Sequence, residues 1–539
     1  MDLAASKPAR PFVRDATGLV RQISSFDALA MALSGMGLLF VFNKVVFTPA
    51  LYPAANPLAP SVFGFLVTLP IAGMYAMMSI AVARTGGDYV WVRRIIHPAV
   101  GFVVNFAMTI LILSFTGTTA PAVVQWSFAE TVYDLGILYH NQAYVNLANY
   151  LQQSAPTFWI SVLIVTVTGL MVIASTRVST LIVRYWTLLA FMIAGGFVLV
   201  ILSVGNSGFV ANFNAMSGTT YAAVVAQGHQ IGARTGIPSL WTLDSLYAGA
   251  VVGSLGYSGF FLSSYFAGEV RQVSRTQIVA LLGSPLIYGL LTGVVIYVAY
   301  LGEGSAFVSA MARLWITGSS KFPYFSIPSA AALSIFWTQN PVLVACFNLS
   351  YGATIIVMNI AYFLALSRNI FAWSFDRVLP SAFASLSDRT HTPVYAAGLE
   401  ILVGISFVYV AVYRFGLLAS YFSYGVAGIF IGYIFVALAG ATFPFVRKDL
   451  FDQSDAIVRK KLGGVPLITV LSVLSMVVSA IVVYGVVRPT IGGVSFVVVL
   501  LEGIVPTFMI GTAIYILAYI FRLRQGLNLN LIRNELPPE

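Results

Sequence analysis

The sequence predicts an all-α integral membrane protein with about twelve transmembrane helices, in which two five-helix repeats of opposite orientation precede two further helices. Hydrophobic residues make up 59% of the 539 residues, charged residues make up only 9%, and the mean hydropathy is +0.90. Such a chain has too few polar side chains to cover soluble domains, whereas a bilayer solvates apolar surface. Two further observations, the alternation of basic loops and two glycine-rich interruptions, predict the topology.

Twelve apolar stretches are long enough to cross a bilayer, which takes about 20 residues of α-helix. Proline, glycine or charged side chains separate most of them. The stretches lie near residues 26–54, 61–83, 98–128, 157–175, 181–205, 246–268, 278–301, 341–367, 394–413, 416–440, 465–487 and 494–521.

Basic residues are concentrated on alternate loops. Most of the 28 Lys and Arg residues, including Arg93, Arg271 and Arg447, lie on loops that share a side with the N-terminus. Because cytoplasmic loops carry an excess of Lys and Arg, both termini are expected in the cytoplasm of a multi-pass plasma-membrane protein. The formal net charge of +10 is thereby explained without a nucleic-acid partner, and the basic face is expected to attract anionic membrane lipids.

Cys346 is the only cysteine, and the chain has only four His residues. An intrachain disulfide is therefore impossible, the sequence holds no Cys/His metal cluster, and no cofactor is expected. The basic tail of residues 1–25 lacks a short apolar core followed by a small-residue cleavage site. We therefore expect no removable signal peptide, and a first helix that acts as its own anchor.

The first span is interrupted at its centre by Ser34-Gly35-Met36-Gly37. Glycine weakens a helix, and backbone groups released at this depth must be satisfied by protein, water or a ligand, so this break is expected to line a substrate cavity. Close helix packing through small residues is the alternative explanation. Beyond the break, Lys44 is the one charge, and its side chain is expected to reach the membrane interface rather than the cavity.

The segments that follow carry three predictions. Residues 90–98, which are aromatic and basic, are expected to lie in the cytoplasmic interface. The long outer loop of residues 206–244 is expected to contain a short surface helix near 220–231. The third span carries hydroxyls that predict either hydrogen bonds between helices or a polar wall of the cavity, namely Ser114, Thr116, Thr118 and Thr119.

A second glycine-rich interruption occurs at residues 249–261, five spans after the first. Corresponding broken helices in two repeats are typical of transporters whose repeats are inverted, and an odd number of spans per repeat gives that inversion. The predicted organisation is a tail (1–25), two repeats (26–205 and 245–440) joined by the outer loop (206–244), a cytoplasmic loop (441–464), two added helices (465–524) and a C-terminal tail (525–539).

Three motifs together resemble the amino acid-polyamine-organocation superfamily of transporters. The break at residues 34–37 is similar to the superfamily's glycine-serine-glycine turn. The segment 267–275 resembles its acidic-basic segment after helix six, with Gln-Val in place of the usual Asn-Pro. The most specific match is the exit of helix eight, formed in order by residues 367–369, 376–380 and 392–393.

This resemblance implies a LeuT-like fold, alternating access and an amino acid substrate. The substrate carboxylate would meet Gly35, Met36 and Gly37, and its amine would meet carbonyls near Ser34 and residues 257–260. These roles agree with the free N–H groups at helix N-termini and the free carbonyls at helix C-termini. The candidate binding set is completed by Tyr257, Ser258, Gly259, Phe260, Phe261 and Thr116, and, by family position, Tyr362 and Tyr421.

The aromatic members of this set favour a neutral, apolar or aromatic amino acid, although core packing would explain each ring equally well. Cationic amino acids, polyamines and nucleobases are the alternative substrates, because aromatic faces also bind cations. A membrane enzyme, a channel or a sensor is disfavoured, because the sequence shows no catalytic set, no ring of charges and no sizeable soluble domain.

The coupling ion is expected to be a proton or sodium, and uncoupled exchange is the alternative. Some members of the superfamily place a lysine in helix five for proton coupling, but the corresponding position here is Ala190. Thr354 is the candidate hydroxyl for a sodium site, although a helical threonine commonly bonds its own backbone. Glu400 and Glu502 are either structurally paired carboxylates or proton sites.

Overall fold

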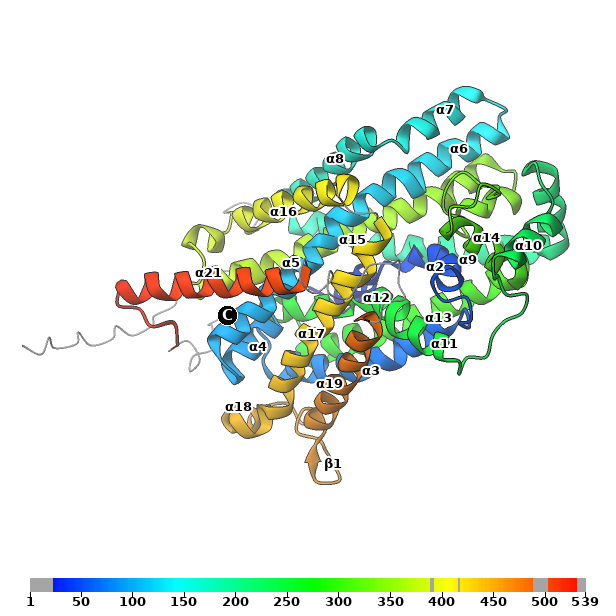
Figure 1. Cartoon of the computed structure of the whole chain (residues 1–539). Coiled ribbons are helices and arrows are strands. Elements are labelled where there is room, and N and C mark those ends of the chain that lie inside the picture. Colours follow the sequence, from blue (N-terminus) through cyan, green and yellow to red (C-terminus); the bar gives the residue numbers. More distant parts are fainter. Residues whose placement is uncertain (1–22, 388–391, 415–416, 488–502, 531–539) are drawn as a thin grey trace, which may run out of the picture.

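The computed structural model describes residues 23–387, 392–414, 417–487 and 503–530, with the side chains of 417–424 and of residue 487 outside the described part. Within these residues, twelve helices are long and apolar enough to cross a membrane. This confirms the predicted all-α architecture and the predicted number of spans (Figure 1). The only sheet of the described chain is a hairpin of two short strands, β1 (Lys461–Leu462) and β2 (Val465–Pro466).

Nine spans are each built on one principal helix, and the third span adds a π-helical turn and a second helix in line. The third span comprises α5 (Pro98–Val123), η2 (Val124–Phe128) and α6 (Ala129–Leu138). The others are α3 (Ala59–Ala81), α8 (Ser154–Ala174), α9 (Thr176–Met216), α13 (Val273–Glu303), α15 (Pro341–Phe375), α16 (Val394–Tyr413), α17 (Leu417–Val446), α19 (Leu467–Val487) and α21 (Val505–Arg524). Helix α9 bends at Gly205 and continues into the segment predicted as the outer loop.

The first span is broken where the sequence predicts. Helix α1 (Ser25–Met36) begins with a capping box between Ser24 and Asp27 and ends at Gly37, whose φ of 68° is a conformation that glycine adopts without steric cost. A short 3₁₀ turn, η1 (Leu38–Phe40), then leads into α2 (Val41–Leu51). The chain therefore restarts as a second half-helix within the same span.

The sixth span is also broken. It comprises α11 (Leu243–Ala248), a π-helical turn η3 (Gly249–Gly253), the single turn α12 (Ser254–Tyr257) and a 3₁₀ segment η4 (Phe260–Glu269). Both π and long 3₁₀ segments are uncommon and mark helices whose regular hydrogen bonding has been interrupted. The interruption coincides with the predicted glycine-rich stretch.

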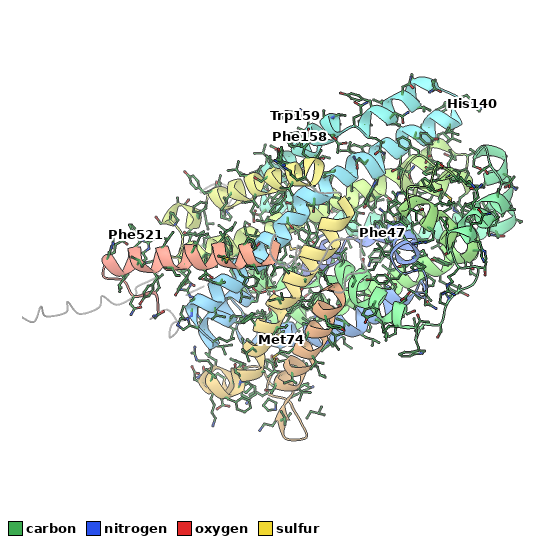
Figure 2. All side chains as sticks on the ribbon, viewed as in Figure 1. Phe47, Met74, His140, Phe158, Trp159 and Phe521 are labelled. Atoms are coloured by element: carbon green, nitrogen blue, oxygen red, sulfur yellow. The ribbon has the colours of Figure 1, made fainter. Side chains whose placement is uncertain are left out.

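The broken spans form the centre of the molecule. In their most apolar windows, 89% of the first span and 83% of the sixth are buried, compared with 28% of the fifth and eleventh. Peripheral helices present apolar side chains outward, as Trp159 on α8 and Phe521 on α21 illustrate (Figure 2). This pattern suits lipid around the periphery and a protein-lined centre.

The shorter elements mark the two ends of the molecule. The α10/α14 end carries α7 (Gln142–Leu151), α10 (Tyr221–Gln230), α14 (Ser305–Ile316) and η5 (Ala332–Phe336). The predicted surface helix near 220–231 corresponds to α10. The opposite end, called the α4 end below, carries α4 (Asp88–Ile95), η6 (Ser381–Ala384) and α18 (Lys448–Asp452).

Helix α4 does not form the surface-lying segment expected for residues 90–98. Every residue of α4 is buried, including Trp91, Arg93 and Arg94. The reason is that Arg93 and Arg94 have a buried carboxylate partner, Asp376, at the end of α15. A sequence pattern of aromatic and basic residues does not distinguish arginines that face lipid headgroups from arginines that form buried ion pairs.

Candidate functional site

The two breaks touch through their backbones. A Cβ atom on Gly259 would collide with the backbone of Gly35 and Met36, and a Cβ atom on Gly35 would lie 2.9 Å from the Gly259 carbonyl oxygen. The Tyr362 hydroxyl of α15 donates to the Gly35 carbonyl at 2.8 Å. Glycine at both positions is therefore required for this close approach, and span eight is tied to the same point.

A cavity extends from the breaks toward the α10/α14 end. Its volume is about 60 Å³, which is enough space for a few water molecules. The first, third, sixth and eighth spans contribute its walls. Its lining residues are Gly35, Met36, Phe40, Lys44, Phe47, Phe115, Trp126, Val252, Leu255, Gly256, Ser258, Tyr351, Met358 and Tyr362.

Four predicted site residues line this cavity: Gly35, Met36, Ser258 and Tyr362. Three others, Ser34, Gly37 and Gly259, lie at the breaks without lining it. The Ser34 hydroxyl lies 3.2 Å from the Thr187 hydroxyl of α9, and the Gly37 N–H donates to the Ser34 carbonyl. The Gly37 N–H is thus engaged by the chain itself rather than free for a substrate.

The predicted aromatic wall differs from the observed one. Phe260 and Phe261 belong to the core on the other side of the break, with ring centroids 5.8 Å from that of Tyr75. The Tyr257 hydroxyl donates to the Ser61 carbonyl at 2.8 Å and its ring lies outside the lining set. Core packing therefore explains all three rings.

Five aromatic residues that the sequence analysis missed form the wall instead. They come from α2 and the turn before it, from the third span and from α15, and they are Phe40, Phe47, Phe115, Trp126 and Tyr351. The sequence did contain a signal for part of this wall. The first break is followed by Phe40, Lys44 and Phe47, and their spacings of four and three residues place them on one helix face.

Lys44 lines the cavity, so the expectation that it reaches the interface is wrong. Its side chain is only 6% exposed, and Nζ lies 4.7 Å from the ring centroid of Tyr288. Side chains tilt toward the N-terminus of their helix, and the N-terminus of the second half-helix is the break. The side chain of Lys44 therefore points back toward the middle of the protein.

The four hydroxyls of the third span form neither of the two predicted arrangements. Each donates to a carbonyl of its own helix three or four residues earlier, and Thr116 donates to the Leu113 carbonyl at 2.7 Å. Such bonds satisfy a hydroxyl inside an apolar helix without any partner from another helix. Thr116 is buried and does not line the cavity.

The residues discussed for ion coupling are also buried away from the cavity lining. The Thr354 hydroxyl donates to the Ser350 carbonyl at 2.9 Å, as is common for a helical threonine, and Ala190 packs in the apolar core. Glu400 is buried, and among the described residues its carboxylate has no hydrogen-bond partner. The side chain of Tyr421 and the whole of Glu502 lie outside the described residues.

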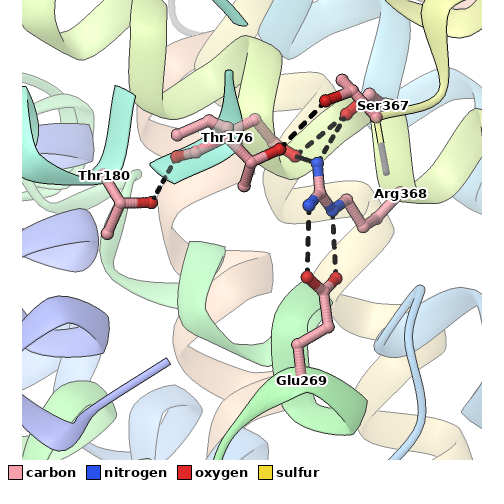
Figure 3. Close-up of polar contacts among 7 residues, drawn as sticks. Thr176, Thr180, Glu269, Ser367 and Arg368 are labelled. Atoms are coloured by element: carbon pink, nitrogen blue, oxygen red, sulfur yellow. Dashed lines mark hydrogen bonds and ion pairs between the residues drawn. The ribbon is translucent and has the colours of Figure 1, made fainter. Parts of the chain in front are cut away.

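The α4 end is closed by buried ion pairs. Glu269, at the end of the sixth span, accepts two hydrogen bonds from the Arg368 guanidinium of α15 at 3.0 and 3.1 Å (Figure 3). The Arg93 guanidinium of α4 lies 2.9 Å from the carboxylate of Asp376, which caps the C-terminal end of α15. Bidentate and charge-assisted bonds of this kind fix the relative positions of the elements that carry them.

Asp88 is the centre of a second polar network at this end. Its carboxylate accepts hydrogen bonds from Tyr75 (2.7 Å), Asn105 (2.7 Å) and Tyr265 (3.1 Å), which join α4 to α3, α5 and the sixth span. Burial raises the pKa of Asp88 to about 6, although the three hydrogen bonds favour the ionised form.

Twelve apolar helices around two touching breaks, with a cavity on one side and a polar closure on the other, define a multi-pass membrane transporter. Over residues 23–520 the chain matches the Amino acid permease family, and it belongs to that family, within the amino acid-polyamine-organocation superfamily. It is therefore a transporter of amino acids rather than an enzyme. No curated protein matches the chain significantly.

Proposed function

We propose that the chain is a secondary transporter that carries an amino acid across the plasma membrane by alternating access, with both termini in the cytoplasm. The observation that carries the proposal is the backbone contact between Gly35 and Gly259 at the inner end of the cavity. The cavity side of this contact would be the open side, and the ion-paired α4 end would be the closed side.

The substrate's backbone groups would bind at the breaks. Helix α1 ends at Met36, so its last carbonyls suit an ammonium, and the half-helix that starts at Leu38 directs its first N–H groups and its positive dipole end toward a carboxylate. Ser258 adds a hydroxyl that lines the cavity. Gly35 and Met36 would contact the substrate through their backbones.

The aromatic wall would hold the apolar part of the substrate side chain. The rings of Phe40, Phe47, Phe115, Trp126 and Tyr351 supply that surface. A cationic amino acid or a polyamine is disfavoured, because it would meet the Lys44 ammonium in the same cavity.

Coupling to a proton or sodium gradient is part of the proposal, with amino acid exchange as the alternative. Gradient-driven uptake would require the ion, whereas exchange would require only an amino acid on each side. Flux with and without an imposed gradient separates the two.

Counterflow in proteoliposomes tests the proposed function. Purified protein is reconstituted into liposomes loaded with each unlabelled amino acid, and entry of the labelled amino acid is followed. We expect transient accumulation without ionic current. Steady ionic current without counterflow would instead show a channel and contradict the proposal.

A further inference from the structure

The amino group of Lys44 is buried, and the described chain provides no anionic partner for it. It lies on α2, with 6% of the side chain exposed, and lines the cavity. No carboxylate of the described residues lies within 4.0 Å of Nζ, and no described side chain or carbonyl forms a hydrogen bond with it. A lysine inside a membrane protein is costly, so an intramembrane lysine normally has a partner or a function.

Two tyrosine rings hold the ammonium without neutralising it. Nζ lies 4.7 Å from the ring centroid of Tyr288 and 5.8 Å from that of Tyr257. Cation–π contacts stabilise a desolvated ammonium by about 2 kcal/mol, and they add no negative charge. The Tyr288 hydroxyl is itself buried and has no hydrogen-bond partner among the described residues.

The position of Gly256 fixes where the ammonium lies relative to the breaks. A Cβ atom on Gly256 would collide with Nζ and would lie 2.8 Å from the Tyr288 hydroxyl. Gly256 precedes Gly259, the point of contact between the breaks, by three residues, which corresponds to about 4.5 Å along a helix. The amino group of Lys44 therefore lies beside the sixth span, three residues before the point where that span contacts the first break.

None of the other buried carboxylates of the described chain is paired with Lys44, and those of Glu130 and Glu400 have no hydrogen-bond partner among the described residues. Asp134 accepts hydrogen bonds from Tyr324 and Asn348. Glu303 ends α13, fifteen residues beyond Tyr288, which corresponds to about 22 Å along the helix. The described lining residues of the cavity include no Asp or Glu.

We propose that Lys44 binds an anionic group on the substrate side chain, so that the transported amino acids are acidic. This inference rests on the proposed function, because it assumes that the substrate's backbone groups bind at the breaks. The side-chain carboxylate replaces the missing anionic partner of Lys44, and the Tyr288 hydroxyl adds a hydrogen-bond donor. The acidic class replaces the neutral class that the sequence favours, since that prediction placed Lys44 at the interface.

The test compares binding of L-glutamate, L-aspartate, L-leucine and L-arginine to purified full-length protein. Three variants are used: Lys44→Met, which removes the charge at similar length; Lys44→Arg, which keeps it; and Lys461→Met, which makes the same net-charge change at an exposed site on β1. Melting temperatures without ligand establish that each variant is folded. Lys44→Met is expected to melt no lower than wild type, because it removes an unpaired buried charge.

We expect wild type to bind an acidic amino acid most tightly. Lys44→Met should raise the Kd for that amino acid about thirtyfold or more, as expected when one partner of a buried charged pair is removed, and should not weaken binding of leucine. Lys44→Arg and Lys461→Met should retain the acidic preference. Tightest binding of leucine by wild type, or a Kd for glutamate in Lys44→Met within about twofold of wild type, would overturn this inference alone. Binding of none of the four amino acids would overturn this inference, and the counterflow assay with the remaining amino acids would then decide whether the proposed function fails as well.

Discussion

At the α4 end, charged side chains meet in buried pairs and hydrogen-bond networks, whereas the cavity on the other side of the breaks is walled by aromatic rings. The α4 end contains the Glu269–Arg368 pair, the Arg93–Asp376 pair and the Asp88 network. Among the described lining residues, the cavity contains only one charged group, Lys44.

This difference has a physical consequence. Burial of apolar surface is non-directional, so a wall of rings can accept a ligand with small rearrangements. Buried ion pairs depend on geometry, and a pair that loses one partner leaves a costly charge behind. The α4 end is therefore expected to open or close as a unit, which is what alternating access requires of the closed side.

The largest expected effect comes from breaking the pair at the α4 end. Arg368→Met leaves Glu269 buried and unpaired, which we expect to cost about 3–5 kcal/mol of stability. The measurement is thermal unfolding of purified protein. Arg447→Met, which breaks the more exposed pair with Asp449, is the matched control and should cost about 0–1 kcal/mol. Equal losses in both variants would show that the α4 end is not held by its buried charges.

The second prediction concerns the pH dependence of the Asp88 network. The pKa of Asp88 is raised from 3.8 to about 6 in the folded protein, so its contribution to stability is fully present below pH 4 and is lost as the pH rises through about 6. For this group alone the loss is about 3 kcal/mol. Thermal unfolding between pH 5 and 7.5 should therefore show a larger fall in melting temperature for wild type than for Asp88→Asn. Parallel pH profiles would contradict this assignment.

The third prediction concerns the backbone contact between the two breaks. Gly259→Ala places a methyl group against the Gly35 backbone, and we expect this overpacking to cost about 1–3 kcal/mol and to abolish substrate binding. Gly196→Ala is the control, because a Cβ atom there meets no atom within 4 Å. Binding is measured by ligand-induced thermal stabilisation. If Gly259→Ala binds the amino acid as tightly as wild type does, the contact between the breaks is not the substrate-binding site.

The smallest expected effect is at the third span. Thr116→Val removes a hydroxyl that bonds only its own helix, so we expect a stability change within about 0.5 kcal/mol and unchanged amino acid affinity. A clear loss of affinity would show that the Thr116 hydroxyl contributes to the polar wall predicted from the sequence. Equilibrium binding of the radiolabelled amino acid provides the measurement.

The sequence could predict the spans and both breaks, because apolar length and glycine placement are local signals. It could not place side chains around the cavity, because which face of a helix turns inward depends on neighbouring spans. Phe260 and Phe261 illustrate this, since they follow a break yet pack against Tyr75 in the core. Lys44 illustrates it again: a long side chain can extend either toward the interface or toward the breaks, and only the surrounding Tyr257 and Tyr288 distinguish the two. The buried pairing of α4 with Asp376 joins segments that are far apart in the chain.

Thiol labelling from each face of the membrane most directly tests whether the cavity opens to one side only. In a Cys346→Ser background, a cysteine is introduced at Ser258, which lines the cavity, or at Ser264, which is buried at the α4 end. A membrane-impermeant thiol reagent is then applied to either face, with and without amino acid. The account predicts that Ser258→Cys reacts from the extracellular face only, and that Ser264→Cys reacts from the cytoplasmic face only when substrate drives turnover. Equal reaction of Ser258→Cys from both faces without substrate would contradict it.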